Sequence, residues 1–119
     1  MTRSTRTYVE DILAEMDRIE RFVGEMSPSD LQASDLVSYA VIRAFEVIGE
    51  AAKHVPDDVR ARCPEVMWRE MAGMRDRLAH AYWGTEMSFA WVTIYERFPI
   101  ERAALRRLLD DLSRDRPAG

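Results

Sequence analysis

The sequence predicts an all-α protein, an antiparallel bundle of four to five helices. Apolar residues recur at spacings of three and four through most of the chain, and no window shows the sustained two-residue alternation of a strand. The five glycines and five prolines are interpreted as breaks between periodic runs. The 119 residues, 47% hydrophobic and 32% charged, suit one globular core, so we expect a single domain over residues 1–119.

A first helix is predicted from Tyr8 to Val23, where apolar residues share one face and charged residues mostly the other. Ser27 then offers a cap, and Pro28 a first helical position, for a long central helix that Pro56 ends. The remaining helical segments are expected at 57–62, from about Glu65 to Tyr82 or Gly84, from Thr85, and from Pro99 onward, with a frayed tail at 114–119.

The charge of the chain restricts how it can bind nucleic acid. The net charge is −4, which argues against binding through bulk positive charge. However, residues 1–60 hold 7 basic and 12 acidic side chains, whereas residues 61–119 hold 10 and 9. Basic charge is therefore concentrated in the second half, where we expect any chemistry on an anionic substrate.

Composition also bears on location and on cofactors. The lone Cys63 precludes an intramolecular disulfide, and no Cys/His cluster has the spacing of a zinc site. No apolar run approaches the ~18 residues of a membrane span, and the first residues resemble no signal peptide. The expectation is a cytoplasmic protein with neither a bound metal nor a membrane partner.

The segment from Gly73 to Gly84 carries the densest set of chemically active side chains. Its His80 belongs to the residue type that titrates near neutrality, which suits proton transfer. Arg75 offers a fork of donors that can stabilise a phosphate or another developing anion. Asp76 can orient either of them, as a carboxylate does for a working histidine.

Helical geometry limits how these side chains can meet. At about 100° per residue, Arg75 and His80 lie about 140° apart around a helix. They can converge if the helix ends or bends before Tyr82, or if a second subunit completes the site.

The same residues also fit structural roles. Arg75 to Arg77 can form an exposed helix face with local ion pairs. His80 and Tyr82 can be hydrogen-bonded residues of an interface. The second histidine, His54, follows Lys53 at a predicted helix end, where the helix dipole favours a cation.

Arg75-Asp76-x3-His80-Ala81-Tyr82 resembles the Arg-x4-His-x-Tyr signature of HEPN-domain proteins, in particular the HepT-like toxin family. Members of that family are partners of MntA-type minimal nucleotidyltransferase antitoxins. The residue after the arginine is often asparagine there and is Asp76 here. Three further segments extend the resemblance over roughly residues 5–112: Phe45–Lys53 with its glycine-glutamate-alanine centre, Pro64–Arg69, and Phe89–Val92 followed by Phe98-Pro99.

The resemblance implies a homodimeric, metal-independent endoribonuclease toxin that cleaves RNA in a cleft between subunits. In that reading His80 is the general acid or base, Arg75 neutralises the reacting phosphate and Asp76 positions them. Tyr82 matches the tyrosine that the partner nucleotidyltransferase adenylylates to block the toxin. Arg77 and Arg69 are expected to add contacts to RNA. The alternative is a non-catalytic HEPN subunit that serves as a scaffold or nucleotide-binding partner of a nucleotidyltransferase.

Overall fold

The structure, a computed structural model, describes residues 4–79 and 85–114, and these residues form helices joined by short turns. The all-α prediction is confirmed. The elements in chain order are α1 (Thr5–Val23), α2 (Pro28–Ala33), α3 (Asp35–Lys53), α4 (Asp57–Arg60), α5 (Trp68–Ala79), α6 (Thr85–Val92), the π-helix η1 (Thr93–Arg97) and α7 (Phe98–Arg114).

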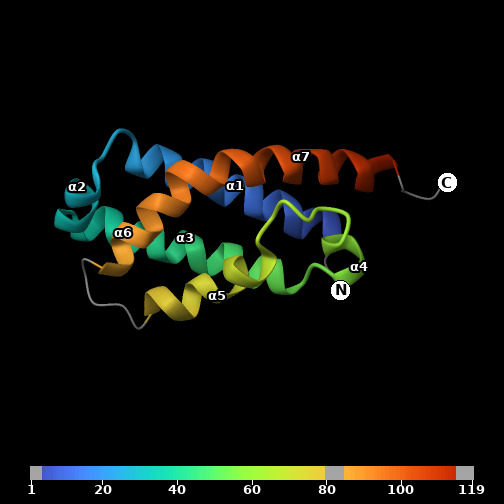
Figure 1. The fold of residues 1–119 in the computed structure, drawn as a ribbon, viewed down its shortest axis with the longest axis horizontal. Helices are drawn as coiled ribbons and strands as arrows, with labels where there is room; N and C mark the ends of the chain where they lie inside the picture. Colours follow the sequence, from blue (N-terminus) through green and yellow to red (C-terminus); the bar gives the residue numbers. More distant parts are fainter. Residues whose placement is uncertain (1–3, 80–84, 115–119) are drawn as a thin grey trace.

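The long helices run along the axis of an elongated bundle (Figure 1). Helix α3 lies between α1 and α5, and α7 packs on α1. Successive long helices run in opposite directions, as expected for an antiparallel bundle. The short helices α2 and α6 pack together at one end, and α4 lies near the other end, beside the start of α1.

Both ends of α1 follow from local sequence. The Ser4 hydroxyl accepts a hydrogen bond from the Thr7 backbone N–H and so caps the first turn. Gly24 ends the helix with a φ of 55°, a left-handed conformation in which a side chain would be strained. Its N–H still donates to the carbonyl of Glu20, which satisfies one of the last carbonyls of the helix.

The predicted central helix is in fact two helices. Ser27 caps the start of α2, as predicted, and the Asp30 side chain accepts from the Ser27 N–H in return, which completes a capping box. Ser34 then leaves the helical region, with φ −103° and ψ 99°, and its side chain caps a new helix through the N–H of Val37. The expectation of one continuous helix up to Pro56 was therefore wrong. Ser34 was not recognised as a second cap because the apolar pattern runs through it.

Helix α5 begins at Trp68, three residues later than expected. The N–H of Met67, the residue before the helix, donates a hydrogen bond at 3.0 Å to the carboxylate of Glu101 on α7. Trp68 is buried and donates its indole N–H to the Cys63 carbonyl. The predicted helix end at Tyr82 or Gly84 lies outside the described residues.

The last two predicted helices, α6 and α7, are joined without a break by the π-helix η1. The π-helix Thr93–Arg97 lies directly before Pro99, which lacks an N–H and whose ring would clash with a carbonyl one turn earlier in a regular helix. The widened turn accommodates Pro99, and α7 begins at Phe98, one residue before the proline that was predicted to open it. Residues 115–119 of the expected frayed tail lie outside the described residues, and Arg114 belongs to α7.

The core is made of buried apolar side chains from every helix. The largest fully buried side chains include Ile12, Met16, Ile19, Leu31, Ile48, Met87, Phe98, Leu105 and Leu108. Within residues 4–79 and 85–114, no helix combines the length and the apolar character needed to cross a bilayer.

Candidate functional site

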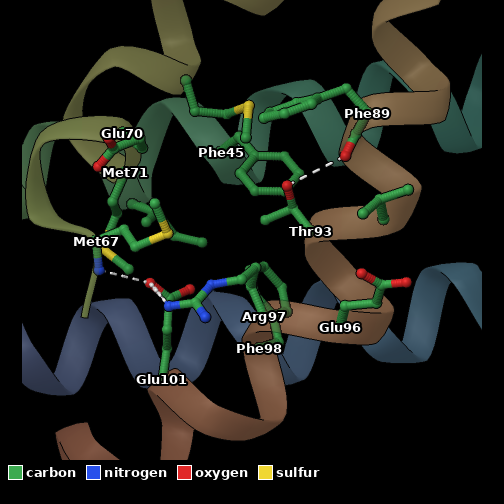
Figure 2. Close-up of a pocket in the computed structure, with 13 residues that line it drawn as sticks. Phe45, Met67, Glu70, Met71, Phe89, Thr93, Glu96, Arg97, Phe98 and Glu101 are labelled. Carbon is green, nitrogen blue, oxygen red and sulfur yellow. Dashed lines mark hydrogen bonds and ion pairs between the residues drawn. The ribbon is translucent and has the colours of Figure 1, made fainter. Parts of the chain in front are cut away.

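Two hollows flank helix α5, and they differ in chemistry. The first, here called the apolar cavity, has a volume of about 250 Å³ and lies between α3, α5, the π-helix and α7 (Figure 2). Its lining is mainly aromatic and methionine side chains with several charged groups: Phe45, Ile48, Met67, Glu70, Met71, Met74, Phe89, Val92, Thr93, Glu96, Arg97, Phe98 and Glu101.

Glu101 is the buried charge of the apolar cavity. Its side chain is 5% exposed, and burial raises its pKa. The hydrogen bond from the Met67 N–H and the nearby Arg97 guanidinium, 4.0 Å away, oppose that rise, while Glu70 adds to it. Figure 2 shows this carboxylate between Met67 and Arg97 at one side of the cavity. Its role is to hold the start of α5 against α7.

A pH prediction follows from Glu101. Since its folded-state pKa lies above the unfolded value, the stabilising state is the protonated one. The associated stability is fully present below the unfolded pKa and is lost as pH rises through the folded pKa. Glu101→Gln, which stays neutral, should resemble wild type in unfolding free energy near pH 4 and become relatively more stable toward pH 7. Urea unfolding at several pH values measures this, and a difference that is flat or falls with pH would contradict it.

The second hollow contains Arg75 and is here called the Arg75 cavity. It has a volume of about 450 Å³, lies between α1, α3 and α5, and is lined by Tyr8, Asp11, Arg43, Glu46, Val47, Glu50, Ala51 and Arg75. Five of its eight lining residues are charged, against four of the thirteen that line the apolar cavity, so its walls are the more polar. It is therefore the better candidate for chemistry on a charged substrate.

Gly49 determines how closely α5 approaches α3 beside this cavity. A Cβ at position 49 would lie 3.2 Å from the Ala72 carbonyl oxygen and 3.3 Å from that of Met71, and 3.7 Å from the Cβ of Arg75. The absence of a side chain thus lets the two helix backbones pack directly, with Arg75 at the contact. This glycine lies inside α3, within the central helix that the sequence predicted, and serves packing there.

Gly49→Ala is expected to destabilise the fold by about 1 kcal/mol. Alanine favours helix by ~1 kcal/mol, but the two backbone carbonyls cannot move without shifting α5, and overpacking of this kind costs about 1–3 kcal/mol. Gly73→Ala is the matched control, because a Cβ there meets nothing within 4 Å and should stabilise α5. Chemical denaturation of both variants checks this, and a Gly49→Ala protein as stable as Gly73→Ala would refute the close contact.

The predicted site residues on α5 point to different neighbours. Arg75 reaches α3, where its guanidinium lies 4.0 Å from the carboxylate of Glu50. Arg77 instead stacks on the ring of Phe89 on α6, 3.4 Å from its centroid, and so does not line the Arg75 cavity. Asp76 and Arg69 are exposed, with Arg69 in the first turn of α5.

The remaining two predicted site residues, His80 and Tyr82, lie outside the described residues. The described part of α5 ends at Ala79, directly before His80. The structure thus places Arg75, Asp76, Arg77 and Arg69 but leaves their relation to the histidine and the tyrosine as predictions.

Glu50 lines the Arg75 cavity and was not among the site residues predicted from the sequence. Besides Arg75, its carboxylate faces His54 Nε2 at 3.5 Å, and the His54 ring stacks on Tyr8 of α1 with centroids 4.7 Å apart. His54 is the C-cap residue of α3, at the helix end where the sequence placed it. The sequence feature that points to Glu50 is the Gly49-Glu50 pair, which is used above only for the family resemblance.

Other reactive groups in the described part of the chain have structural settings. Burial raises the pKa of the Cys63 thiol to about 11, with a further contribution from Glu65, so the thiol is protonated at neutral pH and is a poor nucleophile. Across residues 4–79 and 85–114, no three His, Cys, Asp or Glu side chains gather as metal ligands.

Comparisons with known proteins bear on this site. The family model "Ribonuclease HepT-like" matches residues 12–108. A protein of Thermococcus cleftensis named "Probable ribonuclease HepT" is 42% identical over 108 residues, covering 91% of this chain and 98% of the relative. "Putative RNase MJ0125" of Methanocaldococcus jannaschii is 36% identical, covering 92% and 95%, and "Putative RNase TTE0752" of Caldanaerobacter subterraneus is 34% identical, covering 90% and 96%. No solved structure matches the chain.

Proposed function

Because this chain belongs to the HepT-like ribonuclease family, we propose that it is a metal-independent endoribonuclease whose Arg75 and His80 act on RNA in a cleft between two subunits. The family and the ribonuclease class expected from the sequence are confirmed. One observation supports the site most: the Arg75-x4-His80-x-Tyr82 motif lies inside the family-matched stretch, with the Arg75 guanidinium at a charged cavity.

The proposed reaction is an attack within the RNA itself. The 2′-hydroxyl oxygen forms a bond to the adjacent phosphorus while the bond from phosphorus to the 5′-oxygen breaks, leaving a 2′,3′-cyclic phosphate and a free 5′-hydroxyl. One proton must leave the 2′-hydroxyl and one must reach the 5′-oxygen. We assign the proton transfers to His80, and to Arg75 the neutralisation of the charge that grows on the phosphate oxygens. No metal is required because the nucleophile belongs to the substrate.

A dimer would supply what one subunit lacks in this scheme. The reaction moves two protons, whereas each chain offers one motif histidine, so two copies of His80 facing one phosphate provide both a base and an acid. Arg75 suits such a cleft because its side chain is 49% exposed and thus accessible to substrate. Light scattering at micromolar concentration should give about twice the chain mass of 13.8 kDa, and a monomer mass would contradict the shared cleft.

The biological role that we propose is that of a toxin controlled by a nucleotidyltransferase antitoxin. Adenylylation of Tyr82, two residues after His80, would add a bulky anion beside the phosphate site and exclude RNA by size and like charge. Arg77 and Arg69 would add contacts to the RNA backbone.

Expression of the chain alone and together with a nucleotidyltransferase of the MntA type tests this role. We expect growth arrest from the chain alone, relief on co-expression, and one or more AMP masses on the peptide containing Tyr82. Tyr82→Phe should stay toxic in the presence of the antitoxin. Harmless expression of the wild-type chain, together with intact cellular RNA, would favour the non-catalytic scaffold instead.

A further inference from the structure

We propose that Glu50 is the positioning residue for Arg75, holding its guanidinium in the orientation that phosphate chemistry needs. This role rests on the proposed ribonuclease function and adds a residue from α3 to a site otherwise drawn from one short segment of the chain. It follows from how α3 and α5 pack and from what the Glu50 carboxylate contacts.

The backbone of α3 fixes where Arg75 begins. The Arg75 Cβ lies 3.7 Å from the point that a Cβ on Gly49 would occupy, so the two helices touch at this level. Glu50 is the next residue on α3 and lines the same cavity as Arg75. The distance between the two side-chain origins is therefore set by rigid helix packing and not by a loop.

The Glu50 carboxylate uses its two oxygens on two different partners. Oε2 lies 4.0 Å from Arg75 NH1, and Oε1 lies 3.5 Å from His54 Nε2. His54 is itself held by its stack on Tyr8. The neighbouring carboxylate of Glu46 lies 3.3 Å from Arg43 instead. One oxygen of the Glu50 carboxylate thus contacts His54, and the other faces Arg75.

On this proposal the contact with Glu50 orients the Arg75 guanidinium and leaves some of its N–H donors available for substrate. Arginine has five N–H donors in a rigid fork, so a carboxylate near NH1 leaves the other edge of the group able to bind phosphate oxygens. A long side chain held in the productive orientation loses less entropy on reaching the transition state. Because Arg75 and Glu50 are 49% and 57% exposed, their ion pair adds little to stability. The effect of Glu50 should therefore be on turnover.

A variant without the Glu50 charge distinguishes two effects of this residue: positioning of Arg75 and electrostatic repulsion of RNA. A carboxylate near the phosphate site repels RNA, so Glu50→Gln on electrostatic grounds alone would lower KM and leave kcat unchanged. If Glu50 positions Arg75, Glu50→Gln should lower kcat by about 10- to 100-fold with KM unchanged or lower. Glu50→Asp, which keeps the charge on a shorter arm, should recover part of that loss.

The experiment measures kcat and KM for RNA cleavage, together with melting temperature, for wild type, Arg75→Ala, Glu50→Gln, Glu50→Asp and Glu20→Gln. The last is the matched control, since Glu20 also pairs with an arginine across two helices, Arg102 at 2.6 Å, away from the Arg75 cavity. We expect Glu20→Gln to keep wild-type kcat, and Glu50→Gln to lose kcat while melting close to wild type.

The outcomes distinguish this role from the function on which it rests. Wild-type cleavage that Arg75→Ala abolishes supports the ribonuclease site; Glu50→Gln with wild-type kcat would then overturn the role of Glu50 alone. A kcat loss in Glu50→Gln that follows a large fall in melting temperature would also overturn it, because Glu50 would then serve the fold. If wild type leaves RNA intact, the proposed function fails, and the positioning role with it.

Discussion

Arg75→Ala is expected to reduce RNA cleavage by about 10²- to 10³-fold, the cost typical of removing one donor that stabilises a developing oxyanion. The fold should persist, because the ion pair with Glu50 is half-exposed and contributes little to stability. Arg75→Lys should cleave RNA at a rate between those of wild type and Arg75→Ala, since its ammonium keeps the positive charge but lacks the forked pair of donors. Cleavage rates with circular dichroism as the fold check measure this.

The control for Arg75→Ala is Arg114→Ala, which removes an exposed arginine that pairs with Asp111 at the far end of α7. It should cleave RNA like wild type. If Arg75→Ala keeps a third or more of wild-type activity, or if both variants lose activity equally, Arg75 is not the residue that neutralises the phosphate.

His80→Ala is expected to reduce cleavage by about 10²- to 10⁴-fold, the range for loss of a general acid or base. The bond changes still require two proton transfers, which water performs poorly in place of a positioned imidazole. The cleavage rate of His80→Ala should also depend less on pH between pH 5 and 8 than the rate of wild type.

His54→Ala changes the other histidine of the chain and should cost less than His80→Ala, because His54 contacts Glu50 at 3.5 Å and so acts on the reaction only through the positioning of Arg75. A His54→Ala variant as inactive as His80→Ala, or a His80→Ala variant near wild-type activity, would move the proton transfer away from the motif.

The helix pattern in the sequence was sufficient for the fold class and for several helix ends. Ser27 caps a helix that Pro28 begins, and α3 ends before Pro56, both as predicted. The break at Ser34 was missed because a serine cap inside a continuous apolar pattern leaves the periodicity unchanged. The π-helix was missed because Pro99 indicated the start of α7 but not the widened turn that joins it to α6.

For the site, the sequence indicated Arg75 but not its partner. Glu50 is 25 positions earlier in the chain, and only the packing of α3 on α5 through Gly49 brings the two together. The divergence of Arg75 and Arg77 does follow from helical spacing, since residues two apart face different sides. Their particular neighbours, Glu50 and Phe89, depend on which helices pack against α5.

The net charge of −4 argues against broad binding of RNA over the whole surface, but not against binding at a few arginines. The walls of the Arg75 cavity include Asp11, Glu46 and Glu50 as well as Arg43 and Arg75, so this surface does not attract polyanions broadly. Recognition on this account depends on a few arginines in fixed positions and not on a basic surface. Binding should be weak to RNA that cannot reach those arginines.

The ends of the cut RNA test the central proposal most directly. Wild-type protein is incubated with a defined oligoribonucleotide in excess EDTA, the products are identified by mass spectrometry, and the assay is repeated with a 2′-deoxy nucleotide at the mapped cleavage position. The proposal predicts a 2′,3′-cyclic phosphate and a 5′-hydroxyl, with no cut at the deoxy position. Products ending in a 3′-hydroxyl and a 5′-phosphate, cleavage at the deoxy position, or intact RNA until a metal ion is added would contradict it.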